Sequence, residues 1–263
     1  MTVIFLDPRF QFLFFCVFGA CIGSFLGVIV YRMPRGFLLG LPRRSTCTSC
    51  FRKLSIRENI PLISYLVQKG RCCGCGASIG GRALLLEVLA ATLFGAVVLH
   101  KGWGIRSLYY CYLAASLLAI TFIDLDFRII PDKLSLTGLF VGILLSPLLP
   151  QWSLLQSVAG ATLGGGSFWL VSYLYFKATG REGLGFGDVK LLAFIGAFLG
   201  VSGVLGTIFI SSLLGSVIGI TLMLVRRQNM KMAIPYGPFL AIGALCMLFW
   251  GDFIFNGIFF PIG

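Results

Sequence analysis

The sequence predicts an all-α polytopic membrane protein with about eight transmembrane helices and a cytoplasmic loop domain between the first two. Three observations predict this class. The 263-residue chain is 58% hydrophobic and only 11% charged, with a mean hydropathy of +0.97, whereas a soluble domain carries roughly 25% charged residues. Apolar runs of membrane-spanning length recur along the chain, and its basic residues are concentrated in alternate loops.

Eight apolar segments are suited to cross a bilayer as helices. They lie near residues 9–32, 84–100, 106–123, 134–150, 154–176, 189–201, 203–225 and 234–251. The pair at 189–201 and 203–225 is the least distinct, because the first is short and only Ser202 and Gly203 mark a turn. Glycines recur within the later segments, and small residues of this kind allow helices to pack closely.

The basic residues predict the topology. Of 21 Lys and Arg residues, ten lie from Arg32 to Arg82, two at 124–133, three at 177–190 and three at 226–231. The positive-inside rule places these four loops in the cytoplasm and both termini outside, an alternation that eight spans satisfy. Topology therefore accounts for the net charge of +12. We expect contact with anionic membrane lipid and no nucleic-acid partner.

The loop after the first helix carries two cysteine pairs. Cys47-x-x-Cys50 and Cys72-x-x-Cys75, with 21 residues between them, have the form of a four-thiolate zinc site. Disulfides or idle thiols are the alternatives, and a reducing cytoplasm disfavours disulfides. A structural zinc ion would fold a loop that is too short to build a core alone. The predicted organisation is a first transmembrane helix at 1–32, a zinc-binding loop domain at 33–83 and a membrane domain at 84–263.

Two aspartates lie at the ends of apolar segments, where a carboxylate indicates function. Asp124 closes the segment at 106–123, and Asp188 follows Gly185 and Gly187 and opens the segment at 189–201. Such a pair can share a proton and activate water, and the glycines would let a substrate backbone approach. Taken singly, Asp188 also fits a helix N-cap and Asp124 a charge that marks a helix end. The helix dipole favours Asp188 as the base and Asp124 as the acid.

Two further acids have alternative interpretations. Glu87 lies inside an apolar run, five residues after Arg82. It suits either a charge pair with an arginine or a polar pocket between the loop and the helices. Asp132 follows a proline and precedes an apolar segment, which indicates a helix N-cap.

Several short motifs, in this order, resemble the type IV prepilin peptidase family of membrane aspartic proteases over roughly residues 15–245. They are Gly23-Ser24-Phe25-Leu26 leading to Tyr31-Arg32; the loop from Cys47 to Cys75 with Asn59-Ile60-Pro61 and Ser64; Ile79, Arg82 and Glu87; Asp124 followed by Pro131 and Asp132; Gly185-Phe186-Gly187-Asp188 followed by Lys190-Leu191-Leu192; and Ile234-Pro235-Tyr236-Gly237-Pro238-Phe239. Each motif alone is weak, whereas the ordered set is highly specific.

The resemblance implies an activity. Members cut the short basic leader from prepilins and type II secretion pseudopilins at the cytoplasmic face of the bacterial inner membrane. Asp124 and Asp188 would be the catalytic pair, and residues 84–263 would form a seven-helix aspartic peptidase domain. Many members also methylate the new N-terminal residue with S-adenosylmethionine, and Glu87 and Arg82 are the candidate methyltransferase residues.

The chain departs from the family pattern near the loop. Gly27 stands where Asn is usual, Ala83 and Leu84 replace Tyr-Pro, and Tyr65 stands where Trp is common. These changes leave the peptidase motifs intact and bear on methylation, so a peptidase without methyltransferase activity is the alternative. A proton-coupled transporter, which would place acids in mid-span, and a non-enzymatic assembly scaffold are the rival classes.

Overall fold

The structure is a computed structural model that describes residues 7–37, 45–47, 49–150, 152–181, 183–226 and 235–259, with residues 226 and 255–259 described by their backbone only. Within these residues the chain is helical, with two isolated β-bridges and no strand. The chain divides into two compact units, Met1–Ala119 and Ile120–Gly263. We call them the N-terminal and C-terminal units. The predicted boundaries after residues 32 and 83 concern a different kind of division and stay a prediction.

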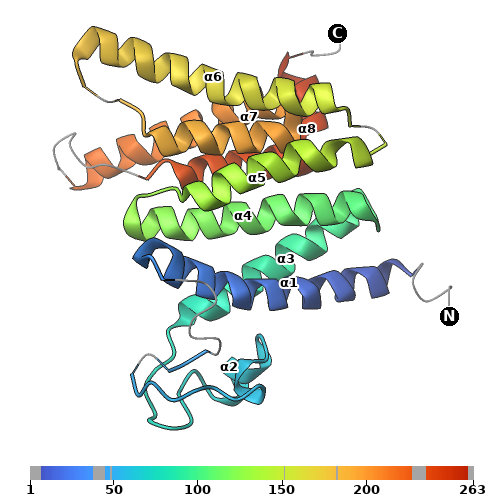
Figure 1. Cartoon of the computed structure of the whole chain (residues 1–263), viewed down its shortest axis with the longest axis vertical. Helices are drawn as coiled ribbons and strands as arrows, with labels where there is room; N and C mark the ends of the chain where they lie inside the picture. Colours follow the sequence, from blue (N-terminus) through green and yellow to red (C-terminus); the bar gives the residue numbers. More distant parts are fainter. Residues whose placement is uncertain are drawn as a thin grey trace. The chain divides into compact units, whose positions relative to one another are not determined.

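Six helices among the described residues are long and apolar enough to cross a membrane, which confirms the all-α membrane fold (Figure 1). The eight predicted segments correspond to five of these helices, to the two arms of α7, which is the sixth, and to the shorter α5. The elements are α1 Pro8–Arg32, η2 Met33–Arg35, η3 Arg57–Asn59, α2 Ile63–Val67, α3 Gly81–Lys101, α4 Ile105–Phe127, α5 Asp132–Leu145, η4 Ser146–Leu148, α6 Leu154–Thr179, α7 Phe186–Arg226 and α8 Gly237–Phe259.

In the N-terminal unit, α1 crosses α3, and the loop that contains α2 joins them (Figure 1). Asp7 caps α1 by accepting the Arg9 backbone N–H at 2.8 Å, and Pro8 occupies the first helical position. Gly19 and Gly23 bring the helices into backbone contact. A Cβ on Gly19 would lie 2.5 Å from the Ala90 carbonyl oxygen, and one on Gly23 would lie 2.6 Å from the Glu87 Cα. This close approach fixes α3 against α1.

In the C-terminal unit, α7 packs against α5, α6 and α8. The backbones of Gly160 on α6 and Gly196 on α7 lie against each other, so the predicted role of glycine in packing is confirmed. A capping box of Ser153 and Gln156 starts α6, and Gly180 ends it in the left-handed conformation.

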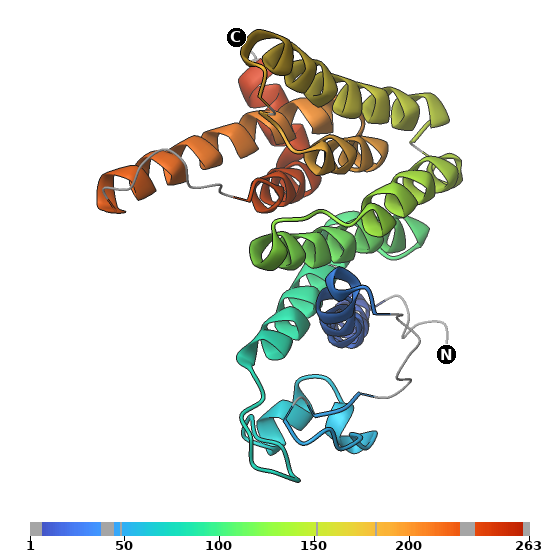
Figure 2. The same ribbon diagram turned by 60° about the vertical axis from the view of Figure 1, so that its left-hand side comes forward.

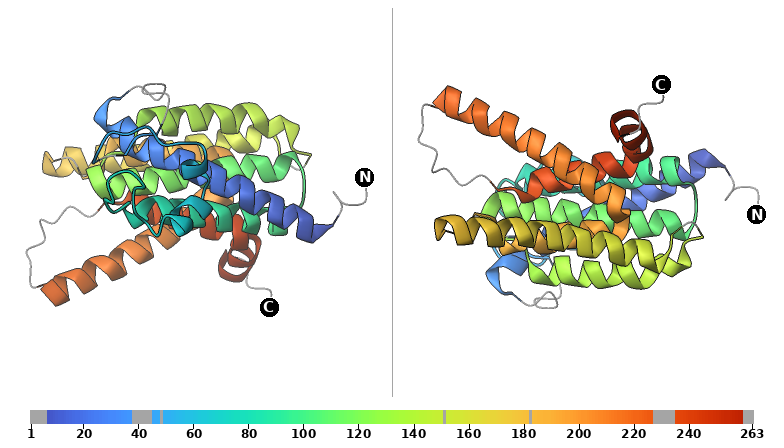
Figure 3. Two further views of the ribbon diagram at one scale, coloured as in Figure 1. Left: turned by 90° about the horizontal axis from the view of Figure 1, so that it is seen from below. Right: turned by 90° about the horizontal axis from the view of Figure 1, so that it is seen from above.

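The helix α7 breaks at Gly200, where φ is 65° and ψ is −168°. The turn was predicted at Ser202 and Gly203, and the structure places it slightly earlier, at Gly200. Glycine adopts this positive-φ conformation without strain. In Figures 2 and 3 the second arm runs outward from the rest of the unit. The first arm carries Asp188 at its start and packs in the core, so the break separates the part of α7 that bears the carboxylate from an arm with many exposed apolar side chains.

Candidate active site and metal site

The C-terminal turn of α4 holds Asp124 as a buried side chain, 5% exposed. Its Oδ2 accepts the Gly237 backbone N–H at 2.9 Å, across 113 residues of sequence. Gly237 is the first residue of α8, and the first N–H groups of a helix have no partner within it. The start of α8 therefore supplies the donor that orients this carboxylate.

Gly237 is required by space as well as by its donor. A Cβ at this position would lie 2.7 Å from Asp124 Oδ2 and 3.2 Å from its Cγ. Any side chain would push the carboxylate away from the N–H that orients it. The sequence motif contained this glycine, but its partner is 113 residues away.

Asp188 lies in the first turn of α7 and is half-buried. Its backbone N–H donates to the Gly185 carbonyl at 3.0 Å. A Cβ on Gly185 would lie 3.1 Å from Asp188 Oδ2, and one on Gly187 would lie 3.0 Å from the Ile130 Cβ. Both glycines therefore make room for groups of the protein itself, and their predicted role in substrate approach stays a prediction.

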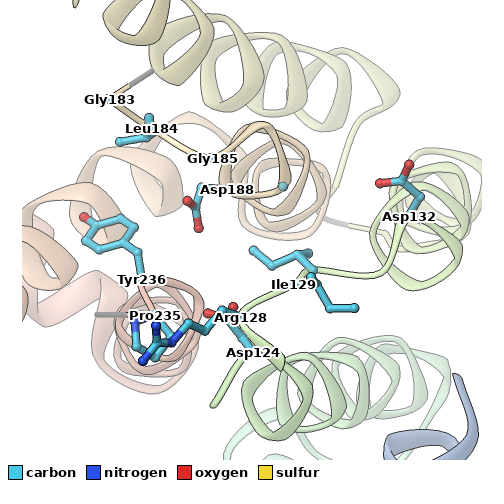
Figure 4. A pocket seen from close by; sticks show the side chains of 12 residues that line it. Asp124, Arg128, Ile129, Asp132, Gly183, Leu184, Gly185, Asp188, Pro235 and Tyr236 are labelled. Carbon is cyan, nitrogen blue, oxygen red and sulfur yellow. The ribbon is translucent and has the colours of Figure 1, made fainter. Parts of the chain in front are cut away.

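One cavity of about 690 Å³ has both aspartates in its lining. Gly185, Gly187 and Tyr236 are also among the residues that line it. In Figure 4 Asp188 and Asp124 approach the cavity from facing sides, while Asp132 is set apart at the start of α5. The structure thus brings together the carboxylates and glycines that the sequence singled out in the C-terminal unit.

The helix-dipole argument does not separate the two aspartates. Asp188 lies at the N-terminus of α7, as predicted, but Asp124 accepts its hydrogen bond from the N-terminus of α8. Each carboxylate therefore faces the positive end of a helix. The expected assignment of base and acid rested on the contrast between a helix N-terminus for Asp188 and a helix C-terminus for Asp124. The contact of Asp124 with the start of α8 removes that contrast.

Asp132 is not the predicted N-cap of α5. Pro131 occupies the cap position, Asp132 is the first helical residue, and its Oδ1 pairs with Lys190 Nζ at 2.7 Å. Lys190 lies two residues after Asp188, and its ammonium also lies 5.1 Å from the Phe186 ring centroid. This ion pair ties the first turn of α7, which carries Asp188, to the start of α5.

Tyr236 connects the cavity to the second arm of α7. Its ring lines the cavity, and its hydroxyl lies 2.9 Å from the Ser211 hydroxyl. The ring also contacts Phe168 and Phe239. Tyr236 is therefore held on three sides, which fixes the wall of the cavity beside Gly237. Ile234, the first residue of the same motif, lies outside the described residues.

The four predicted cysteine ligands form one cluster in the N-terminal unit. The sulfur atoms of Cys47, Cys50, Cys72 and Cys75 all lie within 4.8 Å of one another, and those of Cys47 and Cys75 are 3.8 Å apart. Tetrahedral zinc with Zn–S bonds of about 2.3 Å needs sulfur atoms separated by about 3.8 Å. The residues present therefore fit a four-thiolate metal ion.

Two matching turns hold the cysteines. Cys47 N–H donates to the Arg52 carbonyl and Cys72 N–H to the Ala77 carbonyl, each at 2.9 Å. A bridge flanks each turn, Thr46 with Lys53 and Arg71 with Ser78. The second turn uses Gly76 at φ 70°, whereas the first places Phe51 at φ 57°. The repeated geometry shows that the loop is built around the cysteine cluster.

Backbone N–H groups point at the sulfur of Cys72. The Gly74 N–H donates to Cys72 Sγ at 3.4 Å. Hydrogen bonds from the Cys75 and Gly74 backbones lower the pKa of Cys72 to about 6. The thiolate is the metal-binding form, so the turn prepares this sulfur to act as a ligand.

Glu87 lies within α3 and is 8% exposed. Its Oε2 accepts the Leu62 backbone N–H at 2.7 Å, so the carboxylate binds the loop. This favours the second sequence interpretation, a polar contact between the loop and a helix. Arg82 lies in the first turn of α3 with an exposed side chain. The methyltransferase roles of Glu87 and Arg82 stay predictions.

Comparison with known proteins is consistent with this arrangement. A profile of the bacterial peptidase A24 N-terminal domain matches residues 17–101, and the profile of the type IV leader peptidase family matches residues 111–220. The chain belongs to the type IV leader peptidase family. The matched ranges contain the glycine contact of α1 and α3, the cysteine cluster and both aspartates.

Relatives of similar length carry the name prepilin leader peptidase/N-methyltransferase. The chain is 36% identical to one from Pseudomonas putida, over 97% of this chain and 96% of the relative. It is 38% identical to one from Aeromonas salmonicida, over 94% and 93%. A third, from Neisseria gonorrhoeae, is 32% identical over 92% and 91%. No solved structure matches the chain significantly.

Three contacts in this family member could not be predicted from the sequence. They are the Gly237 donor to Asp124, the Asp132–Lys190 ion pair and the Leu62 donor to Glu87. Each joins residues far apart in the chain, and two of them use a backbone N–H that no side-chain pattern reveals. The signal available in the sequence was the motif around Gly237, which marked the position but not its partner.

Proposed function

We propose that this chain cleaves the leader peptide from type IV prepilins, and from type II secretion pseudopilins, with Asp124 and Asp188 as the catalytic pair. The observation that carries the proposal is their shared cavity, into which two apolar helices each bring one carboxylate. A carboxylate pair in an apolar setting is suited to acid–base hydrolysis of a peptide bond. The names of the relatives support the substrate class.

In the proposed reaction, one aspartate takes a proton from water while the other, protonated, donates a hydrogen bond to the scissile carbonyl oxygen. The water oxygen attacks the carbonyl carbon and a tetrahedral intermediate forms. The proton then passes to the leaving nitrogen, the C–N bond breaks, and a new carboxyl group and a new amino terminus are released. The Gly237 N–H keeps Asp124 oriented through these proton transfers.

We propose that the site faces the cytoplasmic side of the bacterial inner membrane, with the cysteine loop on the same side and both termini in the periplasm. The distribution of Lys and Arg supports this topology. A prepilin has a short basic leader followed by an apolar helix. A cavity at the ends of apolar helices would let that helix stay in lipid while the cleavage point enters the site.

We further propose that the chain methylates the new amino terminus. S-adenosylmethionine, when bound, would supply a methyl group to the uncharged amine, leaving S-adenosylhomocysteine and one proton. The cysteine cluster would hold zinc as a structural ion that folds the loop between α1 and α3. A Cβ at Gly27 would meet no atom within 4 Å, so packing does not exclude the asparagine that is usual there. If the chain methylates its product, it does so with Gly27 in place of the usual asparagine, so methylation by this chain would show that the asparagine is not required.

The test is cleavage of a purified prepilin in lipid, followed by mass spectrometry. Asp124→Asn and Asp188→Asn should each reduce cleavage at least about 10³-fold, because a proton-transfer partner is lost. Asp126→Asn is the matched control, since this exposed side chain lies two residues from Asp124 on the same helix. With methyl donor present, the wild-type product should gain the mass of one methyl group.

Persistence of cleavage in both aspartate variants would remove the proposed mechanism. Absence of cleavage by the wild-type protein would favour the scaffold or transporter classes. Normal cleavage without any gain in mass would leave a peptidase that has lost the methyltransferase activity.

A further inference from the structure

Glu87 has an environment that the proposed peptidase mechanism does not use. It is the most buried acidic side chain after Asp124 among the described residues, at 8% and 5% exposed. Its hydrogen bond at 2.7 Å joins α3 to the Leu62 backbone, 25 residues away and inside the loop that holds the cysteine cluster. A buried carboxylate needs a partner of this kind, because burying it without one is costly.

The partner, Leu62, lies in a strained turn. Its φ is 63° and its ψ is −53°, and Ile63 N–H donates to the Pro61 carbonyl at 2.7 Å. These values describe a γ-turn of the rare, positive-φ kind. A leucine does not adopt this conformation unless surrounding contacts hold it there. The Glu87 carboxylate provides such a contact at the centre of the turn.

The other side of Glu87 is fixed by α1. Gly23 lies so close that an added Cβ would be 2.6 Å from the Glu87 Cα and 2.8 Å from the Leu86 carbonyl oxygen. The backbone of α3 at this position therefore cannot shift toward α1. Glu87 joins three parts of the N-terminal unit: α1 behind it, α3 that carries it and the loop in front of it.

We infer that Glu87 is a positioning residue that docks the cysteine loop onto α3 by binding the Leu62 N–H. The inference rests on the proposed methyltransferase function for its consequence, but the docking itself does not depend on that activity. On this view Glu87 supports methylation by holding the loop and does not exchange a proton with the amine. Its accepting oxygen is already engaged by the Leu62 backbone.

The discriminating variants are Glu87→Gln and Glu87→Met in the full-length, zinc-loaded protein. Glutamine keeps a carbonyl oxygen that can accept the Leu62 N–H but cannot act as a carboxylate base. Methionine has a similar length and offers no comparable acceptor. Three readouts are compared: the rate of limited proteolysis within the loop, methylation of an already cleaved pilin peptide, and cleavage of a prepilin.

We expect Glu87→Gln to stay within about threefold of the wild type in all three readouts. Glu87→Met should raise the rate of loop proteolysis by about tenfold or more, because a hydrogen bond to a buried charged group is lost. Methylation should fall in parallel, while cleavage stays within about threefold. If glutamine abolishes methylation while the loop remains protected, Glu87 is an acid–base group and the inference is overturned.

Leu62→Gly provides an independent check. The donor is a backbone N–H, and glycine adopts φ 63° without strain, so the loop should remain as protected as in the wild type. If the loop of Leu62→Gly is digested as rapidly as that of Glu87→Met, the leucine side chain and not the backbone N–H docks the loop. That result would contradict the inference. A wild type that never methylates would defeat the proposed second activity, whereas the proteolysis results would still decide the docking.

Discussion

The carboxylate site and the cysteine site are assembled in different ways. The first draws Asp124, Asp188 and Gly237 from the ends of α4, α7 and α8, and 113 residues separate the two ends of its internal hydrogen bond. The second gathers four sulfur atoms from residues 47–75, in a segment whose longest helix has five residues. The carboxylate site therefore depends on the packing of long helices, whereas the cysteine site depends on bonds made within one loop. The two should respond to different perturbations.

Removal of the metal should have the largest structural effect, and this effect should be confined to the cysteine site. Cys72→Ser, or treatment with a strong chelator, should unfold the loop, because a structural zinc ion supplies most of the folding free energy of so small a segment. Limited proteolysis should then cut freely between residues 45 and 80. Metal content, measured by mass spectrometry, should fall from one ion per chain to none.

Cleavage of prepilin by the metal-free protein shows whether the carboxylate site is affected as well as the loop. The candidate metal ligands all lie in the N-terminal unit, so we expect cleavage to stay within about tenfold of the wild type, a far smaller change than that of a catalytic variant. Cys73→Ser is the matched control, since Cys73 lies outside the sulfur cluster. Equal loss of cleavage and loop structure would show that the two sites are not independent.

Gly237→Ala should be the most damaging small substitution at the carboxylate site. The added methyl group would lie 2.7 Å from Asp124 Oδ2, so the carboxylate must move away from its donor. A misplacement of about 1 Å can cost about 100-fold in rate. We expect kcat for prepilin cleavage to fall by about that factor with KM nearly unchanged, because the substrate-binding surface is retained.

Gly166→Ala is the matched control, since a Cβ there would meet no atom within 4 Å. It should keep wild-type cleavage. A rise in KM with unchanged kcat in Gly237→Ala would mean that Gly237 serves substrate binding and does not orient Asp124.

Lys190→Met should have a smaller effect. The Asp132 side chain in this ion pair is 59% exposed, so solvent screens the interaction and its contribution is at most about 1 kcal/mol. Cleavage should fall about threefold, as the first turn of α7 loses one tie to α5. A double-mutant cycle with Asp132→Asn measures the coupling directly, and additive effects would show that the pair does not position Asp188.

The sequence predicted most of the fold because its signals are carried by single segments. Apolar length identified the long helical segments, and recurring glycines indicated close packing. The break in α7 was placed near Ser202 and Gly203 instead of Gly200, because any of several glycines could supply the turn. The cysteine spacing indicated the metal site since ligands and turns lie within a few residues of each other.

The contacts around the site residues could not be predicted in the same way. The Gly237 N–H and the Leu62 N–H are backbone groups, and every non-proline residue has one. Their partners are chosen by how helices and loops meet in three dimensions. The error over Asp132 has a related cause: a residue after proline at a helix start fits an N-cap, but Lys190 from another helix binds its carboxylate.

The smallest expected effect concerns Glu58 in the loop. The Ser55 backbone N–H donates to its carboxylate at 2.8 Å, and Arg52 forms an ion pair with it. These two contacts lower the pKa of Glu58 from 4.5 to about 2. Because the folded pKa is depressed, the stabilisation is complete above pH 4.5 and is lost as the pH falls from 4.5 toward 2.

Glu58→Gln should remove only this pH-dependent part. Acid also protonates the cysteines and releases the metal in both proteins, so the difference between wild type and variant isolates the carboxylate. Loop proteolysis, measured with an acid-active protease from pH 6 to pH 2, should be slower in the wild type at pH 6, and the two rates should converge near pH 2. A constant difference across this range would show that Glu58 stabilises the loop through its shape or neutral hydrogen bonds and not through its charge.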